Sequence, residues 1–374
     1  MRIQLLFTSP FFFLLPWCVA QAQSNQFGYQ LEVGGQTYQA NNAVSIDQFD
    51  ADFAGYDPKH SQLFALGENS AYIQATRSNY TIRIYKHQEI FINAGRETGQ
   101  LYADINAGQL PTASTAYTVD FDGYGIEQTG LSLSRRFEVP VLESAQPITI
   151  APALRIYNIN RYREIQARGN ALARADGSYD LAINTAERDT RADFVFPVGQ
   201  PPSGSGYALD LSLQWQVSPQ LQLFLQTRDL YNANQIKNTP TTVQTLNSNV
   251  NQFDENGVLN YRPAIQGQNS RQDYDFSLPV KTHLGARLLT GLTNSNSLGL
   301  DIRHIQGLVL PRISVAWAFD NSWVKQTEFG YESHFESFDA TIDFKYGGVR
   351  LGLDTFDDEK RRVEFLQIYM RQTF

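Results

Sequence analysis

The amino-acid sequence predicts an all-β protein: a single antiparallel transmembrane β-barrel of about 14 strands, with a range of about 12 to 16. Three observations carry this prediction. Apolar and polar residues alternate with a period of two over many segments, short turns separate these segments, and no segment has a convincing helical pattern. The even strand number is an expectation for closed barrels rather than a count.

The second half of the chain gives the clearest strands. Between residues 207 and 217 apolar side chains occupy every second position, and Ser218-Pro219-Gln220 then turns the chain into a further alternating segment. Residues 338–346 alternate in the same way, and Gly347-Gly348 predicts a hairpin turn. Segments of this kind, each about 9–11 residues long, are typical of strands that cross a membrane at a tilt.

A water-soluble β-sandwich would also alternate, but two features favour a barrel. The apolar face often starts or ends in an aromatic residue, as at Tyr207 and Trp215 or at Phe338 and Tyr346, where the girdles of a membrane barrel lie. The opposite face is polar or charged on nearly every strand. A closed barrel can hold such a face around a wet lumen.

Residues 1–22 are typical of a secretory signal peptide. A positively charged start precedes a mostly apolar stretch, and Ala20-Gln21-Ala22 forms a small-x-small cleavage site. A membrane-anchor helix fits less well because the apolar stretch is short and contains two prolines. A lipoprotein signal fits less well because Trp17 precedes Cys18. Cleavage near Ala22 would leave residues 23–374 as the barrel, without a cysteine.

The last segment, residues 363–374, alternates up to a terminal aromatic residue. Ile368 and Met370 share one face, and the chain stops on Phe374. This pattern resembles the closing strand of Gram-negative outer-membrane β-barrels, a class in which a terminal Phe after alternating apolar residues is the signal for the barrel-assembly machinery. The resemblance is to the class and to no single family. It implies location in the outer membrane, with membrane lipid and the assembly machinery as partners. An ordinary amphipathic edge strand would show the same alternation.

Two polar stretches interrupt the rhythm. Residues 231–272 are rich in Asn and Gln, and they predict a long loop that is either extracellular or folded into the lumen. A second, shorter insertion is expected at about residues 185–205.

Composition and motifs exclude several functions. The formal net charge of −8 argues against a nucleic-acid partner. The five histidines stand in no metal-ligand spacing, and no GxSxG motif occurs. We therefore predict no catalytic residues, no enzyme activity, no metal and no cofactor. Pairing His304 with Asp301, or His334 with Asp339, rests only on their closeness in the sequence.

The strongest constellation is a set of charges on the inferred lumen face of the late strands. They are Arg287, Arg303, Arg312, Arg350, Asp301, Asp339, Asp343 and Asp354. In one interpretation, rows of Arg and Asp line a water-filled pore and filter solutes. In the other, the same charges pair across strands and fill a closed interior, which the even alternation of sign favours. The sequence does not decide which charges meet.

The other face of these strands is predicted to contact hydrocarbon, at Ile313, Val315, Ile342 and Leu213. An arginine near the bilayer midplane on that face should cost about 2–4 kcal/mol. At Ala316 or Thr341, on the polar face, the cost should be much lower.

Passive, porin-like transport of a small, unidentified solute is the function that this pattern favours. The alternative is a structural or assembly protein of the envelope, with a filled lumen and loops that bind a partner. Residues 231–272 would separate the two functions, because an inward fold would gate a pore and an outward fold would make a contact surface.

Overall fold

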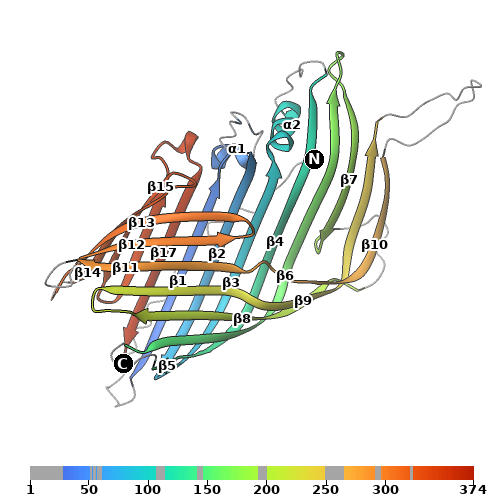
Figure 1. Cartoon of the computed structure of the whole chain (residues 1–374). Helices are drawn as coiled ribbons and strands as arrows, with labels where there is room; N and C mark the ends of the chain where they lie inside the picture. Colours follow the sequence, from blue (N-terminus) through green and yellow to red (C-terminus); the bar gives the residue numbers. More distant parts are fainter. Residues whose placement is uncertain are drawn as a thin grey trace, which may run out of the picture.

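The computed structural model describes residues 28–50, 53, 56, 61–106, 114–140, 146–192, 200–248, 265–290, 296–320 and 323–374. The predicted signal peptide, residues 1–22, lies outside them. One antiparallel sheet dominates the described part of the chain (Figure 1).

The elements, in chain order, are β1 (Tyr29–Asn41), α1 (Ile46–Asp50), β2 (Gln62–Arg77), β3 (Tyr80–Gly95), α2 (Arg96–Asn106), β4 (Ala116–Arg135), β5 (Phe137–Val139), β6 (Ile148–Ala173), β7 (Tyr179–Asp189), β8 (Ser203–Gln216), β9 (Leu221–Asn247), β10 (Ile265–Phe276), β11 (Lys281–Thr290), β12 (Asn296–Ile305), β13 (Leu308–Ala318), β14 (Val324–Glu332), β15 (Ser337–Phe344), β16 (Gly347–Leu353), a short 3₁₀ helix (Asp358–Lys360) and β17 (Val363–Thr373).

The sheet closes on itself because β17 pairs with β1. In this antiparallel register Gln30 lies opposite Thr373, and Ala40 lies opposite Val363. The closed ring follows the order β1, β2, β3, β4, β6, β8, β9 and β11 to β17, which makes 14 strands. The predicted fold class, a single antiparallel barrel of about 14 strands, is confirmed.

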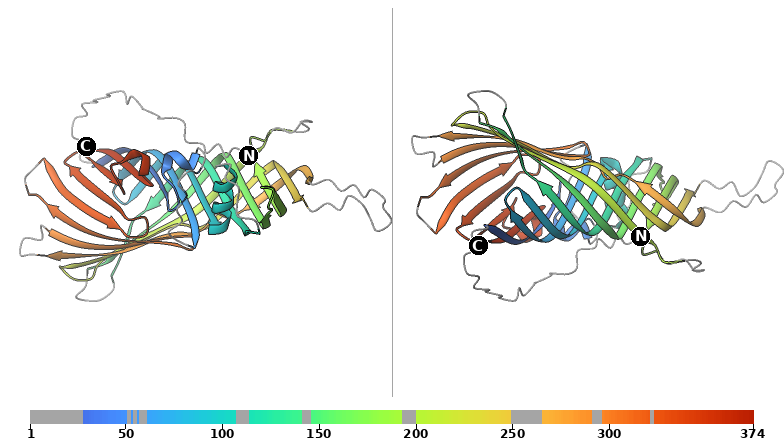
Figure 2. Two further views of the ribbon diagram at one scale, coloured as in Figure 1. Left: turned by 90° about the horizontal axis from the view of Figure 1, so that it is seen from above. Right: turned by 90° about the horizontal axis from the view of Figure 1, so that it is seen from below.

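Strands β7 and β10 lie beyond this ring and extend one side of the wall. Residues 148–159 of β6 pair with β8, whereas residues 163–173 pair with β7. Residues 221–228 of β9 pair with β11, and the later part of β9 pairs with β10. β7 therefore continues the line of β8, and β10 continues the line of β11. In both views of Figure 2 the yellow strand β10 lies at the end opposite the orange and red strands.

The polar stretch at residues 231–272 was expected to be one long loop, and this expectation is wrong. Residues 231–247 belong to β9 and residues 265–272 belong to β10, while 249–264 lie outside the described residues. The extension of the wall explains the error. Its strands are mostly polar because they lie beyond the apolar part of the barrel surface, so they lack the hydrophobic alternation that marks a membrane strand.

Exposed apolar side chains form a belt on the outer face, next to the end that carries Tyr29 and Phe374, which we call the terminal end. On β3, Ile82 and Ile84 are 50% and 61% exposed, whereas Tyr85 on the inner face is 8% exposed. The belt ends at Lys86, whose ammonium group lies 2.8 Å from a Glu127 carboxylate oxygen. A continuous apolar belt of this kind is favourable against lipid and costly against water.

Three of the four expected lipid-facing residues, Ile313, Val315 and Ile342, are exposed in this belt, whereas Leu213 is half-buried. Ile313 and Ile342 are 58% and 41% exposed. One part of the expectation is wrong: Ala316 does face inward, but it is only 4% exposed, so an arginine there would overpack the interior. Thr341 is half-buried and lies opposite Arg350 in the sheet.

Two helices, which the sequence analysis did not expect, pack on the outer face at the other end of the barrel, which we call the helical end (Figure 1). Ala103 of α2 belongs to one buried cluster with Ile90 and Ile92 of β3, which share the face of Ile84. The helices have 5 and 11 residues, too few for a clear periodic pattern. None of the described helices is long and apolar enough to cross a membrane.

Candidate functional site

A cavity of about 630 Å³ lies inside the barrel, and we call it the chamber. Its lining comes from ten strands of the ring: β1, β2, β8, β9, β11 to β14, β16 and β17. Tyr38 and Leu310 line it toward the helical end, and Gln214 and Gln222 line it beside the β8–β9 turn. Polar side chains face the chamber because alternation points every second residue of each strand inward.

Arg312 of β13 holds the centre of one charged network in the chamber wall. Its guanidinium group donates to Asp301 at 2.9 Å, to Glu328 at 2.7 Å and to Asp339 at 2.8 Å. These three carboxylates come from β12, β14 and β15, so a single side chain ties four adjacent strands together. The carboxylate side chains are only 8–9% exposed.

Two further arginines complete this network from the chamber side. Arg287 pairs with Glu328 at 3.0 Å, and Arg350 pairs with Asp339 at 3.0 Å. Their side chains are 36% and 31% exposed, much more than those of the carboxylates that they contact. The arrangement places acids in the wall and guanidinium groups at the surface of the chamber.

Five of the eight charges that the sequence predicted to line a pore therefore meet in one network: Arg287, Asp301, Arg312, Asp339 and Arg350. The other three lie outside this network. Arg303 also lines the chamber, with its guanidinium group 5.3 Å from the centre of the Tyr38 ring. Asp343 accepts a hydrogen bond from the Tyr369 hydroxyl at 2.6 Å. Asp354 accepts from the backbone N–H groups of residues 362 and 363.

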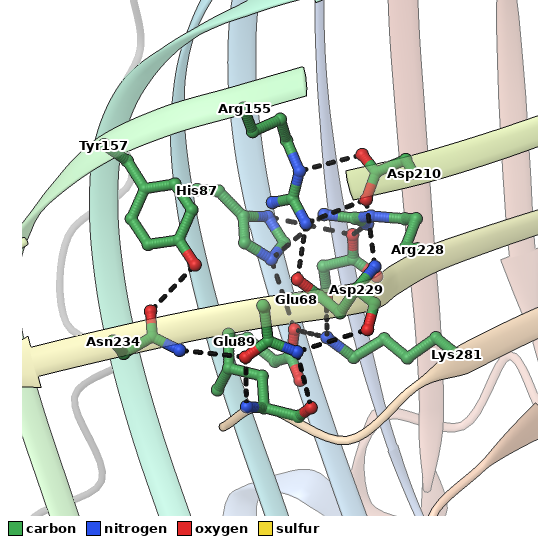
Figure 3. A network of polar contacts seen from close by, with 12 residues as sticks. Glu68, His87, Glu89, Arg155, Tyr157, Asp210, Arg228, Asp229, Asn234 and Lys281 are labelled. Atoms are coloured by element: carbon green, nitrogen blue, oxygen red, sulfur yellow. Dashed lines mark hydrogen bonds and ion pairs between the residues drawn. The ribbon is translucent and has the colours of Figure 1, made fainter. Parts of the chain in front are cut away.

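A second charged network, which the sequence analysis missed, crosses the interior (Figure 3). Lys281 of β11 lies 2.5 Å from Glu89 of β3 and 3.3 Å from Asp229 of β9. Arg228 of β9 lies 2.9 Å from Glu68 of β2. In the ring, β9 and β11 are separated from β2 and β3 by β4, β6 and β8, so these contacts span the lumen.

The same network is anchored in the wall by Arg155 of β6. Its guanidinium group lies 2.8 Å from Asp210 and 2.5 Å from Asp229, and Asp229 is 1% exposed. Asp229 has a positive φ of 57°, at the place where the register of β8 and β9 shifts. One feature of the sequence could have pointed to this network. The alternation of residues 221–225 stops at the Arg228-Asp229 pair, which marks a break in the strand.

Apolar side chains fill the lumen above the chamber, on the side of the helical end. Phe64, Phe91, Leu308 and Leu310 form one buried cluster with Tyr38. Phe91 is 1% exposed and Leu310 is fully buried. Together with the contacts of Lys281, Arg228 and Arg303 across the lumen, this cluster makes a ceiling over the chamber.

The pair of His304 and Asp301, which their closeness in the sequence suggested, does not form. Asp301 instead bonds His283 at 2.9 Å, because His304 lies on the opposite face of β12. Asp339 is engaged by Arg312 and Arg350.

The residues of the predicted assembly signal lie on β17 and at its end. Ile368 and Met370 are 48% and 56% exposed on the outer face. The backbone N–H of Phe374 donates to Tyr29 at 2.8 Å, which continues the β1–β17 pairing to the last residue.

No protein-family profile matches the chain, and no curated protein matches it. Solved structures give distant similarities. The toluene transporter TodX of Pseudomonas putida has 9% identity and a TM-score of 0.39, with 94% of this chain and 89% of that chain covered. The outer membrane protease OmpT of Escherichia coli has 7% identity and a TM-score of 0.25, with 95% and 99% covered. A FadL homologue of Pseudomonas aeruginosa has 8% identity and a TM-score of 0.22, with 93% and 90% covered. Similarity at this level says nothing of the function of this chain, and its fold rests on its own strand pairing.

Proposed function

We propose that the chain is an outer-membrane β-barrel that transports a small hydrophilic solute through its lumen. The observation that carries this proposal is the chamber of about 630 Å³, which is lined largely by charged and amide side chains. Pockets of this size suit small molecules. A lining of arginine and glutamine is wetted by water and binds polar groups, whereas a lipophilic solute would need an apolar lining. No catalytic role is proposed.

Placement in the membrane is supported by the outer surface. A closed barrel leaves no unpaired strand edge in hydrocarbon, and the apolar belt beside the terminal end supplies the surface that lipid requires. The extended wall and the helices would then project from the helical end into water.

Conductance of the purified protein in a planar bilayer tests transport. Steady, stepwise openings, together with swelling of proteoliposomes in an isotonic sugar solution, are the expected result. Folding is checked on the same preparation by the shift in gel mobility on heating, which closed barrels show. A folded, inserted protein that neither conducts nor admits sugars would contradict the proposal.

A structural barrel with a filled lumen is the second candidate, and the ceiling favours it. Ion pairs and apolar side chains close the lumen above the chamber. Such a barrel would not conduct in the bilayer, and it would still not conduct after the ceiling side chains are truncated. Conductance measurements therefore separate the two functions.

The assembly signal at the end of the chain is a separate proposal. Deletion of Phe374 should lower the level of protein in outer membranes, because the β1–β17 pairing would lose its last bonded pair and the assembly machinery its terminal aromatic residue. Phe374→Tyr, which keeps both features, is the matched control. Equal membrane levels of the deletion variant and the parent, by quantitative immunoblot, would contradict the proposal.

A further inference from the structure

We propose that the chamber binds a small polyhydroxylated anion, of the sugar-acid class, with Arg303 and Arg287 as the residues that hold its carboxylate. This inference rests on the proposed function for its role in transport, but binding itself can be measured without transport.

The accessible charge in the chamber is positive, although the interior contains many acids. Side-chain exposures of Arg228, Arg287 and Arg350 are 39%, 36% and 31%, respectively. The acids that hold them in place are mostly hidden: Asp301 and Asp339 are 9% exposed, and Glu328 is 8% exposed. An entering solute therefore meets guanidinium groups first, and a wall of low dielectric strengthens their field.

Among the arginines of the chamber, Arg303 has the most N–H donors available to a solute. Among the described residues it makes no salt bridge, and it contacts Tyr38, with its guanidinium group over the ring at 5.3 Å and beside the hydroxyl. A guanidinium group has five N–H donors in a planar fork that matches a carboxylate, and the contacts with Tyr38 leave most of these donors available. Arg303 lies opposite His283 on β11, four residues along that strand from Arg287, and both arginines line the chamber, with Arg287 nearer the terminal end.

The remainder of the lining suits hydroxyl groups and a sugar ring. Five glutamines, whose amides both donate and accept hydrogen bonds, face the chamber: Gln36, Gln214, Gln222, Gln226 and Gln367. Phe224 and Phe365 add two aromatic rings, which can pack against the C–H face of a sugar. A fully apolar anion would leave these amides without partners, which is costly.

Glu68 restricts the charge that the chamber accepts. It is the most exposed acid of the lining ion pairs, at 26%, and it is held by Arg228 and by the Gln36 amide at 2.9 Å. Its carboxylate would repel a second negative group on that side. A monoanion is therefore favoured over a dianion.

Isothermal titration calorimetry on the purified protein in detergent micelles, at low salt, tests the inference with three pyranoses of matched size. D-glucuronate is the anion, D-glucose the neutral sugar and D-glucosamine the cation. We expect glucuronate to bind about tenfold more tightly than glucose, the size of one charge-assisted hydrogen-bonded contact, and glucosamine to bind most weakly.

Variants assign the carboxylate contact. Arg303→Gln should weaken glucuronate binding by about tenfold and leave glucose binding unchanged, and Arg303→Lys should retain part of the difference. Arg287→Gln is an independent second variant, in case the first fails to fold. Arg135→Gln is the matched control, because Arg135 lies on the outer face over the Tyr80 ring. It should bind all three sugars like the parent.

The outcomes separate this inference from the proposed function. Equal affinity for glucuronate and glucose, or glucuronate binding that survives both Arg303→Gln and Arg287→Gln, would overturn the inference, even if the protein conducts. Saturable glucuronate binding that depends on Arg303, in a protein that does not conduct, would support the site and overturn transport.

Discussion

At the scale of single residues, Arg312 shows how a buried charge can hold a barrel wall together. It satisfies three carboxylates that are almost hidden from water. Burying an ion costs several kcal/mol unless it is paired. Removing the shared partner would therefore leave a buried cluster of negative charges without compensation. The neighbouring arginines cannot replace it, because each reaches only one of the three acids.

Arg312→Met should therefore lower the free energy of unfolding by about 3–5 kcal/mol. The measurement is urea unfolding in bilayers or micelles, followed by tryptophan fluorescence. Arg135→Gln removes the same charge from the exposed outer face and should change stability by about 0–1 kcal/mol. Similar effects of the two substitutions would show that the network does not stabilise the wall.

The apolar belt on the outer face gives a second prediction at this scale. Ile313→Arg should cost about 2–4 kcal/mol, because the side chain lies 58% exposed in the apolar belt. Thr341→Arg, on the inner face opposite Glu328 as well as Arg350, should cost much less. The same unfolding assay ranks the two variants, and the reverse order would refute the assignment of faces.

At the scale of elements, hydrogen bonds join α2 to β4 on the outside of the barrel, and a carboxylate of the first turn makes one of them. Glu97 accepts a hydrogen bond from the Thr118 backbone N–H at 2.6 Å, which joins the first turn of α2 to β4. This hydrogen bond favours the charged form and lowers the Glu97 pKa from its usual value of 4.5. Leu101 and Ala103 are buried on the barrel side of the helix.

Docking of α2 should consequently depend on pH. Because the folded-state pKa is lowered, the contribution of Glu97 is complete above pH 4.5 and is lost as the pH falls through the folded-state pKa. Hydrogen exchange of α2, compared at pH 7 and about pH 3.5 after correction for intrinsic rates, should show faster relative exchange in acid. Glu97→Gln should reduce this difference, and a parent whose protection is the same at both pH values would contradict the assignment.

At the scale of the whole molecule, the barrel encloses a polar chamber under an apolar and charged ceiling. If solutes pass through the lumen, the ceiling limits the flow. Tyr38 and Leu310 are both buried members of the cluster that closes the lumen, and truncating them should open a path without removing a charge.

The double variant Tyr38→Ala, Leu310→Ala should raise single-channel conductance several-fold. Ile92→Ala is the matched control, since Ile92 is equally buried but lies under the helices on the outer face. Both changes remove core packing, at about 2–5 kcal/mol per site, and only the first alters the lumen. Unchanged conductance in the double variant would place the path elsewhere.

The sequence by itself determined the barrel, the inner and outer faces of its alternating strands and the inward direction of the late arginines. These features are local: alternation with a period of two follows directly from strand geometry. It could not determine the polar extension formed by β7 and β10, because those strands lack hydrophobic alternation. It could not determine the two short helices either, because they have too few residues for a periodic apolar pattern.

Only the tertiary structure decided which charges meet. The sequence marked Arg312 and Asp301 but gave no sign that Lys281 reaches Glu89 across the lumen, 192 residues away in the chain. Such pairs depend on the closure of the ring and on the shift at Asp229, and neither is encoded in the spacing of nearby residues. The polar chamber and its ceiling follow from these long-range contacts, so the candidate site could be recognised only after the chain had closed into a barrel.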